Sequence, residues 1–312
     1  MTIAAAAIQA AVDDAHAAAA EETGGANASY IPYLASVPSH LFGLAAATPD
    51  GQIFKAGDTD FLFAIESISK VFTLALVMEE IGIAGVREKL GVEPTGLPFN
   101  SVLALELHDG RPLSPLVNAG AIAAASLVPG DTADSRWPRI LGMQSKFAGR
   151  QITLNDELNA SEQGTNFHNR AIAWLLYSAG NCFSDPMQAV DVYTRQCSTL
   201  ISTVDLAMMG ATLANAGVHP TTKERIVSAD VVEHVLAEMT MEGMYTASGR
   251  WAYEVGLPGK SGVGGGILTV APGKLAIAAF SPPLDAAGNS VRAQAAVSRA
   301  ANMLSLSLYR RT

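Results

Sequence analysis

Two segments that read as strand, turn and strand stand near opposite ends of the chain. Residues 41–58 carry the turn signal Thr48-Pro49-Asp50-Gly51 between two apolar runs, and residues 265–282 carry Pro272-Gly273 between two more. A lone hairpin would leave backbone edges unpaired and an apolar face uncovered. We therefore expect the two hairpins to pair in one antiparallel sheet, which brings the two ends of the chain together.

Between the hairpins, apolar residues recur at the spacing of a helix. The segments with this pattern are VFTLALVMEEIG, VNAGAIAAASLV, NRAIAWLLYSAGNC, MQAVDVYTRQCSTL and TVDLAMMGATLANAG. Two further helices are expected, one in the alanine-rich start of the chain before Gly24-Gly25 and one that begins near Ser290.

These patterns predict an α/β fold of the α+β type, built as a single domain of two lobes over residues 1–312. Residues 1–65 and 251–312 are expected to form one lobe, an antiparallel sheet flanked by helices. Residues 66–250 are expected to form an inserted all-helical lobe. A cleft between the two lobes is the expected functional site.

Composition limits the partners of the chain. The net charge is -9 and no run of lysine and arginine exceeds two residues, which argues against nucleic acid. No segment approaches the ~18 consecutive apolar residues that a membrane-spanning helix needs, so no membrane partner is expected. Cys182 and Cys197 are too few for a disulfide framework and are expected to be buried free thiols. Because the first residues also lack the positive charge that begins a secretory signal, we expect a cytoplasmic protein.

Ser67 and Lys70 form a possible nucleophile and base at the start of a predicted helix, in the segment FAIESISKVF. Residues three apart on a helix share a face, with Cβ atoms about 5–6 Å apart. A lysine can deprotonate serine only if burial or a nearby cation lowers the pKa of its amine. The apolar neighbours favour burial, but a chain of this length would often contain this short pattern by chance, and alone it is more typical of a polar edge on a core helix.

A second motif, Lys260-Ser261-Gly262 in LPGKSGVGGGILTV, stands at the head of a predicted strand. Small residues there let the backbone approach a ligand and direct N–H groups at a developing oxyanion, and Lys260 adds positive potential. In this order, the two motifs form the signature of active-site serine acylases of the β-lactamase and penicillin-binding type.

Cofactor and metal motifs fit the chain poorly. A phosphate loop ending in GKS requires glycine where Glu254 stands and a helix where a strand is expected. The segment GVGGG misses the dinucleotide pattern because Ile267 replaces its last glycine. The six histidines never occur four residues apart. We therefore expect no cofactor and no metal.

A series of ordered segments makes the comparison with a known family specific. They are YIPYLA, GDTDFLFAIESISKVF, GVEPTGLPFNS, PLVNAGAI, SEQGTNFHNRAIA, DVYTRQCS, ATLANAGVHP, GMYTASG, GLPGKSGVGGGI and SPPLDAAGNS. In them the chain resembles, nearly end to end, the serine-dependent glutaminases of the glutaminase A type. The resemblance implies a β-lactamase-like fold, hydrolysis of L-glutamine to L-glutamate and ammonia, no cofactor, and a homo-oligomer, either dimer or tetramer.

The resemblance also implies roles for individual residues. Ser67 would be the nucleophile, Lys70 its base partner and Tyr245 a proton shuttle. The residues implied around bound glutamine are Tyr30, Ser67, Asn118, Glu162, Asn169, Tyr193, Tyr245 and Val263, with the Ser67 and Val263 amides as the oxyanion hole.

These residue types suit glutamine, which is a zwitterion when free. An acid is needed for its ammonium group and neutral donors for its carboxylate. Glu162 suits the first task, and Asn118, Asn169 and Tyr193 suit the second. Each also has a structural explanation, as helix caps for the asparagines, a core aromatic for Tyr193 and a capping group for Glu162.

Two positions depart from the family pattern. Glu66 stands where glutamine is usual, and Thr246 stands where an acid is common. A carboxylate beside Ser67 would oppose the developing oxyanion, so we expect Glu66→Gln to keep or raise activity.

Two alternative functions remain at this stage. One is a β-lactamase or DD-peptidase-like serine acylase on the same fold, which would not need an acid facing an ammonium group. The other is a catalytically silent amino-acid-binding protein, which the presence of Ser67, Lys70, Tyr245 and Lys260 disfavours.

Overall fold

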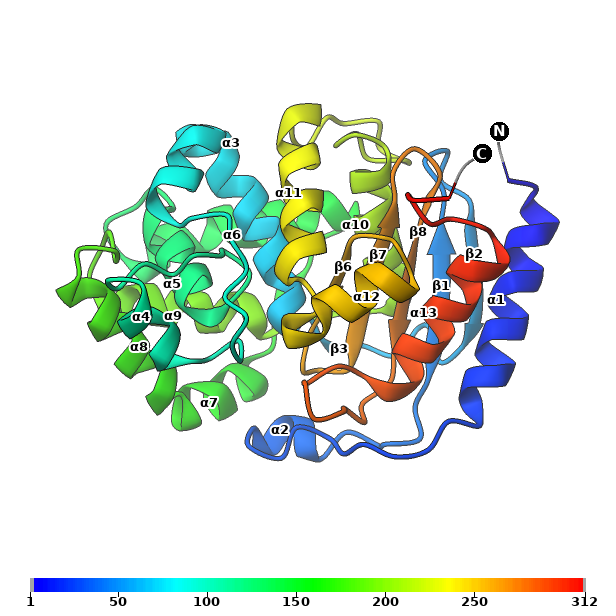
Figure 1. Ribbon diagram of the computed structural model, residues 1–312, viewed down its shortest axis with the longest axis horizontal. Coiled ribbons are helices and arrows are strands. Elements are labelled where there is room, and N and C mark those ends of the chain that lie inside the picture. The colour runs from blue at the N-terminus through cyan, green and yellow to red at the C-terminus, as the bar shows by residue number, and fades with distance from the viewer. Residues whose placement is uncertain (1–2, 311–312) are drawn as a thin grey trace.

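Both terminal hairpins enter one five-stranded antiparallel sheet in the computed structural model, which describes residues 3–310. The hairpins are β1 (Gly43–Ala47) with β2 (Ile53–Gly57), and β7 (Gly266–Ala271) with β8 (Leu275–Phe280). β1 pairs with β8, and β6 (Gly259–Ser261) completes the order β2-β1-β8-β7-β6. The predicted pairing of the hairpins is confirmed (Figure 1). The four outermost residues of the expected sheet lobe lie outside the described residues.

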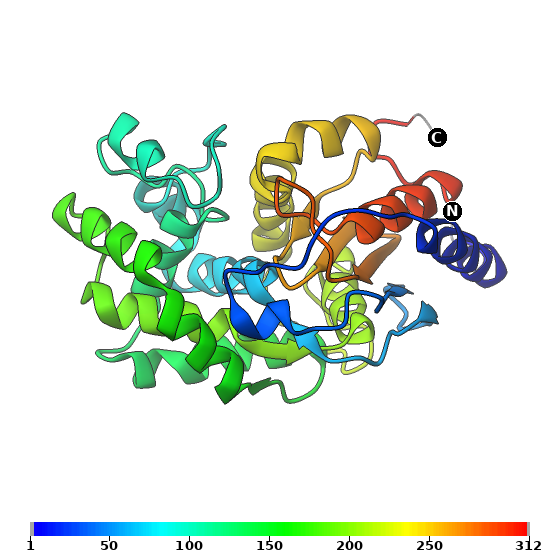
Figure 2. The ribbon, with the colours of Figure 1, turned by 90° about the horizontal axis from the view of Figure 1, so that it is seen from below.

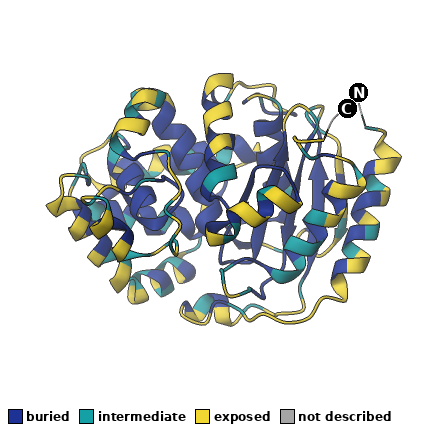
Figure 3. Cartoon of the chain, in the orientation of Figure 1, coloured by how far each residue is buried: buried dark blue, intermediate teal, exposed yellow. Residues whose placement is uncertain are grey.

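Helices cover both faces of this sheet. α1 (Ala5–Ala20) and α13 (Val291–Met303) pack on one face, and α10 (Thr203–Ala214) packs on the other. Successive strand residues point to opposite faces, so Leu44 joins the α1–α13 core and Ala45 joins the α10 core. This explains why β1, β7 and β8 are continuous apolar runs that are buried throughout (Figure 3).

The second lobe consists mainly of helices and lies beside the sheet (Figures 1 and 2). Its helices are α3 (Ser69–Lys89), α4 (Val102–Leu107), α5 (Asn118–Leu127), α6 (Ala133–Ala148), α7 (Asp156–Thr165), α8 (Phe167–Ser178) and α9 (Pro186–Cys197). Side-chain caps begin several of them, such as Asn155 for α7 and Asp185 for α9. The helices predicted from apolar periodicity are all present.

The structure adds a small second sheet that the expected all-helical insert did not include. Its order is β3 (Phe63–Ala64), β5 (Thr199–Ile201) and β4 (Thr153–Leu154), so two of its strands belong to residues 66–250. In addition, α10 and α11 (Ala229–Glu242), from the same segment, pack against the five-stranded sheet. The lobe boundaries at residues 65 and 250 stay a prediction.

The short elements meet where the two lobes join. β3 leads into the 3-10 turn η1 (Glu66–Ile68), which continues directly into the buried start of α3. η1 contacts β6, β7 and α9. η2 (Tyr245–Ala247) and α12 (Ser248–Glu254) follow α11, and α2 (Pro32–Ala35) lies against α7. Across residues 3–310, no helix combines the length and apolar character needed to cross a membrane.

Candidate active site

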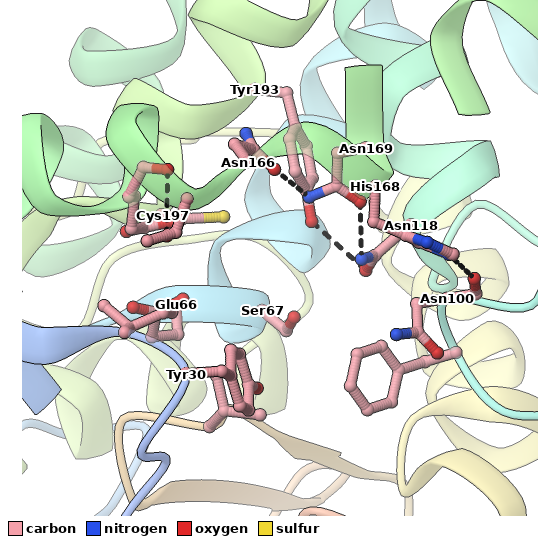
Figure 4. A pocket seen from close by; sticks show the side chains of 15 residues that line it. Tyr30, Glu66, Ser67, Asn100, Asn118, Asn166, His168, Asn169, Tyr193 and Cys197 are labelled. Atoms are coloured by element: carbon pink, nitrogen blue, oxygen red, sulfur yellow. Dashed lines mark hydrogen bonds between the residues drawn. The ribbon is translucent and has the colours of Figure 1, made fainter. Parts of the chain in front are cut away.

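A cavity of about 210 Å³ lies at the junction of η1, α5, α7, α8 and α9 (Figure 4). Seven of the eight predicted substrate contacts line it: Tyr30, Ser67, Asn118, Glu162, Asn169, Tyr193 and Val263. Figure 4 shows Glu66 and Cys197 on one side of Ser67, and Asn118 and Asn169 on the other. The predicted substrate contacts, which are spread from residue 30 to residue 263, therefore gather in one place.

Tyr245, the eighth predicted contact, lines an adjoining cavity of about 660 Å³. The two cavities share Tyr30, Phe99, Asn100 and Val263, so these residues form the wall between them. Thr246, where the family pattern has an acid, is exposed and lines the second cavity but not the first. Its departure from the pattern therefore lies outside the cavity that holds Ser67.

Ser67 and Tyr245 sit on unusual backbone. Glu66, directly before Ser67, has φ 49°, and Tyr245 has φ 56°, a left-handed conformation that residues with a Cβ rarely adopt. Such a conformation costs about 1–3 kcal/mol and persists only where the surroundings impose it. The packing of η1 against β6 and α9 supplies that constraint and fixes the direction of the Ser67 side chain.

Lys70, the second residue of α3, is buried, and its amine donates to Asn118 Oδ1 over 2.7 Å. Burial lowers the pKa of Lys70 to about 8, against the opposing influence of Cys197, Glu66 and Glu242. A large fraction of the amine is therefore uncharged near pH 8. The hydrogen bonds of residues 3–310 do not include one between Lys70 and Ser67, which is common for a base before substrate binds.

Tyr245 and Lys260 lie behind Ser67. The Tyr245 hydroxyl donates to the Ser261 carbonyl oxygen over 3.0 Å, and burial raises the pKa of this tyrosine although a hydrogen bond with Ser67 lowers it. Tyr245 thus stays a neutral hydroxyl that can relay a proton. The Lys260 amine donates to the carbonyl oxygens of Ser261 (2.6 Å) and Gly243 (3.2 Å) and lies 4.4 Å from the Tyr245 ring centre. Burial, followed by the nearby Lys70, lowers the pKa of Lys260 well below its usual range.

A chain of amide side chains runs from Lys70 along the cavity wall. Asn118 accepts from Lys70 and from the Tyr193 hydroxyl (3.1 Å), and donates to Asn169 Oδ1 (2.9 Å). Asn169 in turn donates to Asn166 Oδ1 (2.6 Å). Because each amide has a fixed partner, the network sets the orientation of Asn118 and Asn169 before any ligand arrives.

Glu66 and Glu162 face each other at the opposite side of the cavity. Burial raises the pKa of Glu162 to about 7, although hydrogen bonds with Ser198 and Glu66 lower it. Burial and the Glu162 charge hold the pKa of Glu66 well above its usual range. Both carboxyl groups are therefore inclined to keep a proton.

Glu66, Glu162 and Cys197 also form a possible metal-ligand group, with ligand atoms within 4.8 Å of one another. Burial raises the pKa of the Cys197 thiol well above its usual range, as do both carboxyl groups. Metal binding requires deprotonated ligands, so these three residues fit a metal ion poorly. Both cysteines are free and buried, as predicted.

Several residues of the cavity wall, and Glu242 outside it, were not found by sequence reasoning. Asn166 positions Asn169, Phe99 packs on the Tyr245 ring with centres 4.6 Å apart, and Glu242 influences the pKa of Lys70 and Lys260. Asn166 stands three residues before Asn169, a spacing that places both on one helical face and offered the only sequence signal.

Known proteins match the chain over nearly its full length. The family described as glutaminase matches residues 25–309. A glutaminase from Brucella canis is 71% identical over 303 residues, which cover 97% of this chain and 96% of that protein. The solved structure of the probable glutaminase ybaS has a TM-score of 0.98 and 58% identity, covering 99% of this chain and 100% of that one. The probable glutaminase from Bacillus subtilis, complexed with 6-diazo-5-oxo-L-norleucine, has a TM-score of 0.86 and 30% identity, covering 99% of each chain.

These matches confirm the resemblance and the β-lactamase-like fold. Of the functions considered from the sequence, they support the hydrolysis of glutamine rather than that of β-lactams. The chain therefore belongs to the glutaminase family and is an amidohydrolase that acts on L-glutamine.

Proposed function

We propose that Ser67 carries out this hydrolysis through a covalent γ-glutamyl ester. The observation that carries the proposal is the place of Ser67, on a constrained turn at the cavity wall, with the buried amine of Lys70 three residues further on. The neutral Lys70 amine takes the hydroxyl proton, directly or through Tyr245, while Ser67 Oγ bonds to the amide carbon of glutamine. The carbonyl oxygen becomes an oxyanion in this step.

The second half of the cycle restores the enzyme. The leaving nitrogen receives a proton and departs as ammonia, which leaves the ester on Ser67. Water then loses a proton to the same base, bonds to the ester carbon and releases glutamate as Ser67 Oγ regains its proton. The main-chain amides of Ser67 and Val263 stabilise both oxyanions. The buried amine of Lys260, whose lowered pKa favours the neutral form, supports this region by donating to the Ser261 and Gly243 carbonyl oxygens.

The two sides of the cavity match the two charges of free glutamine. Glu162 is assigned to the α-ammonium group, and Asn118, Asn169 and Tyr193 supply neutral donors for the α-carboxylate, with Tyr30 beside them. The Bacillus subtilis relative binds an L-norleucine derivative with a ketone at carbon 5, where glutamine has its amide carbon. That ligand supports a site for an L-amino acid of this length.

Ser67→Ala tests this scheme. We expect the variant to lose ammonia release while still binding glutamine, measured by a coupled ammonia assay and by calorimetry. Ser298→Ala, which removes a hydroxyl on α13 away from the cavity, is the control and is expected to keep turnover. Sustained ammonia release by Ser67→Ala would eliminate the acyl-enzyme route.

We also propose a homo-oligomer in the cytoplasm. Support for assembly comes from the large apolar side chains that α4 and α8 expose, namely Leu103, Leu107, Phe167, Trp174, Leu175 and Tyr177. We call these residues the α4–α8 face and assign it to contact with a second copy of the chain. Support for the compartment comes from the two free, buried cysteines, which are usual in reducing surroundings.

A further inference from the structure

Glu66 and Glu162 bring two buried carboxyl groups together beside Ser67. Their side chains come from η1 and α7, and the residues are 3% and 8% exposed. Glu162 Oε1 accepts from the Ser198 hydroxyl over 2.9 Å. Glu66 Oε1, in contrast, is buried without a hydrogen-bond partner among the described residues. One oxygen of this pair is therefore an acceptor that still lacks a donor, and both residues line the cavity.

Two ionised carboxylates are unfavourable in this setting because like charges repel strongly where water is excluded. The titratable groups that face Glu66 are Glu162 from α7, Tyr193 and Cys197 from α9, Lys70 from α3, Tyr245 from η2 and Tyr30 from the segment before α2. Lys70 is the only one of these that can carry a positive charge. Since burial lowers the pKa of Lys70 to about 8, its charge compensates only one carboxylate, and only in part.

We propose that Glu66 is a specificity-determining residue that holds a proton beside Glu162, so that the pair presents a single negative charge to the α-ammonium group of the substrate. This inference rests on the proposed function, which assigns the ammonium group to Glu162. The acid form of Glu66 donates to the Glu162 carboxylate and orients it. The free Glu66 Oε1 then accepts a second hydrogen bond from the ammonium group.

The proton on Glu66 also favours the attack of Ser67 on the substrate. An ionised Glu66 would oppose the negative charge that develops beside Ser67 and would raise the pKa of Lys70, which keeps the base protonated. A neutral Glu66 does neither. The residue that departs from the family pattern thus performs, in its acid form, what a neutral amide does: it donates to Glu162 without adding charge.

Two substitutions of Glu66 test this inference. Glu66→Gln keeps a neutral donor, so its KM for glutamine near pH 7.5 is expected within about threefold of the wild-type value. Glu66→Met keeps the length of the side chain but removes the donor, so its KM is expected to rise about tenfold or more. A KM for Glu66→Gln beyond the threefold limit overturns the inference, because it identifies Glu66 as a working carboxylate. A smaller rise for Glu66→Met also overturns it.

A spectroscopic measurement tests the proton itself. In difference infrared spectra at neutral pH, wild type minus Glu66→Gln should contain the band of a protonated carboxyl group, and its absence overturns the inference. Glu238→Gln is the matched control, because Glu238 is a buried carboxyl group of raised pKa outside the cavity. It should remove its own band and leave KM unchanged. Failure of the proposed function is separate, since it appears as turnover that survives Ser67→Ala.

Discussion

At the residue scale, the proposed mechanism depends on the charge of two buried side chains, Lys70 and Glu162. Lys70 acts as a base only when neutral, and its lowered pKa of about 8 makes the neutral form more abundant as pH rises. Glu162 binds an ammonium group only when ionised, and its raised pKa of about 7 makes the ionised form more abundant as pH rises. Loss of a proton from either group should therefore increase activity as pH rises.

We expect kcat/KM for glutamine to rise with pH from about 6 to about 8, and the measurement is the initial rate of ammonia release across this range. In the lower part of this pH range, the rise should come mainly from a decreasing KM as Glu162 ionises. In the upper part, it should come from an increasing kcat as Lys70 loses its proton. A profile that is flat, or that falls as pH rises through this range, contradicts these assignments.

Lys70→Arg separates the contribution of Lys70 to the pH profile from that of Glu162, because arginine stays charged at every pH of the assay. Its kcat is expected to fall by about 10²–10⁴. Lys274→Arg, in the turn between β7 and β8, is the matched control and should retain both kcat and the pH profile.

Sequence patterns pointed to individual candidate residues but not to the contacts between them. The S-x-x-K and K-S-G motifs made Ser67, Lys70 and Lys260 candidates because fixed spacing within one element limits where the side chains point. The contacts of Lys70 with Asn118, and of Glu66 with Glu162, join different elements. Only the packing of α3, α5, α7 and η1 brings those partners together, so no local pattern reports them.

At the element scale, the site depends on how closely the turn between β6 and β7 approaches the segment that carries Ser67. A Cβ added at Gly264 would lie 2.3 Å from the Ala64 carbonyl oxygen and 3.2 Å from Glu66 Cγ. Glycine therefore permits the contact between this turn and the start of η1. The same contact places Val263 at the cavity wall beside Ser67.

We expect Gly264→Ala to lower kcat about 10²-fold, because it moves the Val263 amide away from the developing oxyanion. The overpacking should also destabilise the fold by about 1–3 kcal/mol, measured by urea unfolding. Gly142→Ala, in α6, meets no atom within 4 Å and should keep kcat and stabilise by about 0.5–1 kcal/mol. An unchanged kcat in Gly264→Ala would show that the Val263 amide has no part in the reaction.

Long elements could be predicted from the sequence and short ones could not. The apolar spacing of α3, α9 and α10 extends over several turns, so the pattern repeats often enough to distinguish a helix from a strand. β3 and β4 each contain two residues, and their pairing with β5 is set by tertiary contacts. This is why the insert was expected to be helical throughout.

At the scale of the whole molecule, the two ends carry different surfaces. The sheet end buries β1, β7 and β8 beneath α1, α13 and α10, whereas the helical end presents the α4–α8 face (Figures 1 and 3). Trp174 lies within this face and packs against Tyr177 in a T-shaped arrangement. It is therefore the residue most suited to anchoring a second copy.

We expect Trp174→Glu to convert the proposed oligomer to monomer in sedimentation velocity, because a charge placed on this face is costly to desolvate. Tyr253→Glu, on α12, changes a still more exposed aromatic residue away from the face and should leave the mass unchanged. An oligomer that survives Trp174→Glu would place the subunit contact elsewhere.

The pairing of β1 with β8 makes the order of synthesis matter. During synthesis, Ser67, Lys70 and the whole helical insert leave the ribosome before β6, β7 and β8 have been made or released. Until then, β1 lacks its partner strand β8. Lys260 and Val263 leave the ribosome late, because they stand near the end of the chain. A prematurely terminated product that stops before β6 would thus contain the proposed nucleophile but lack Val263 from the wall of its cavity, so we expect incomplete copies to release no ammonia.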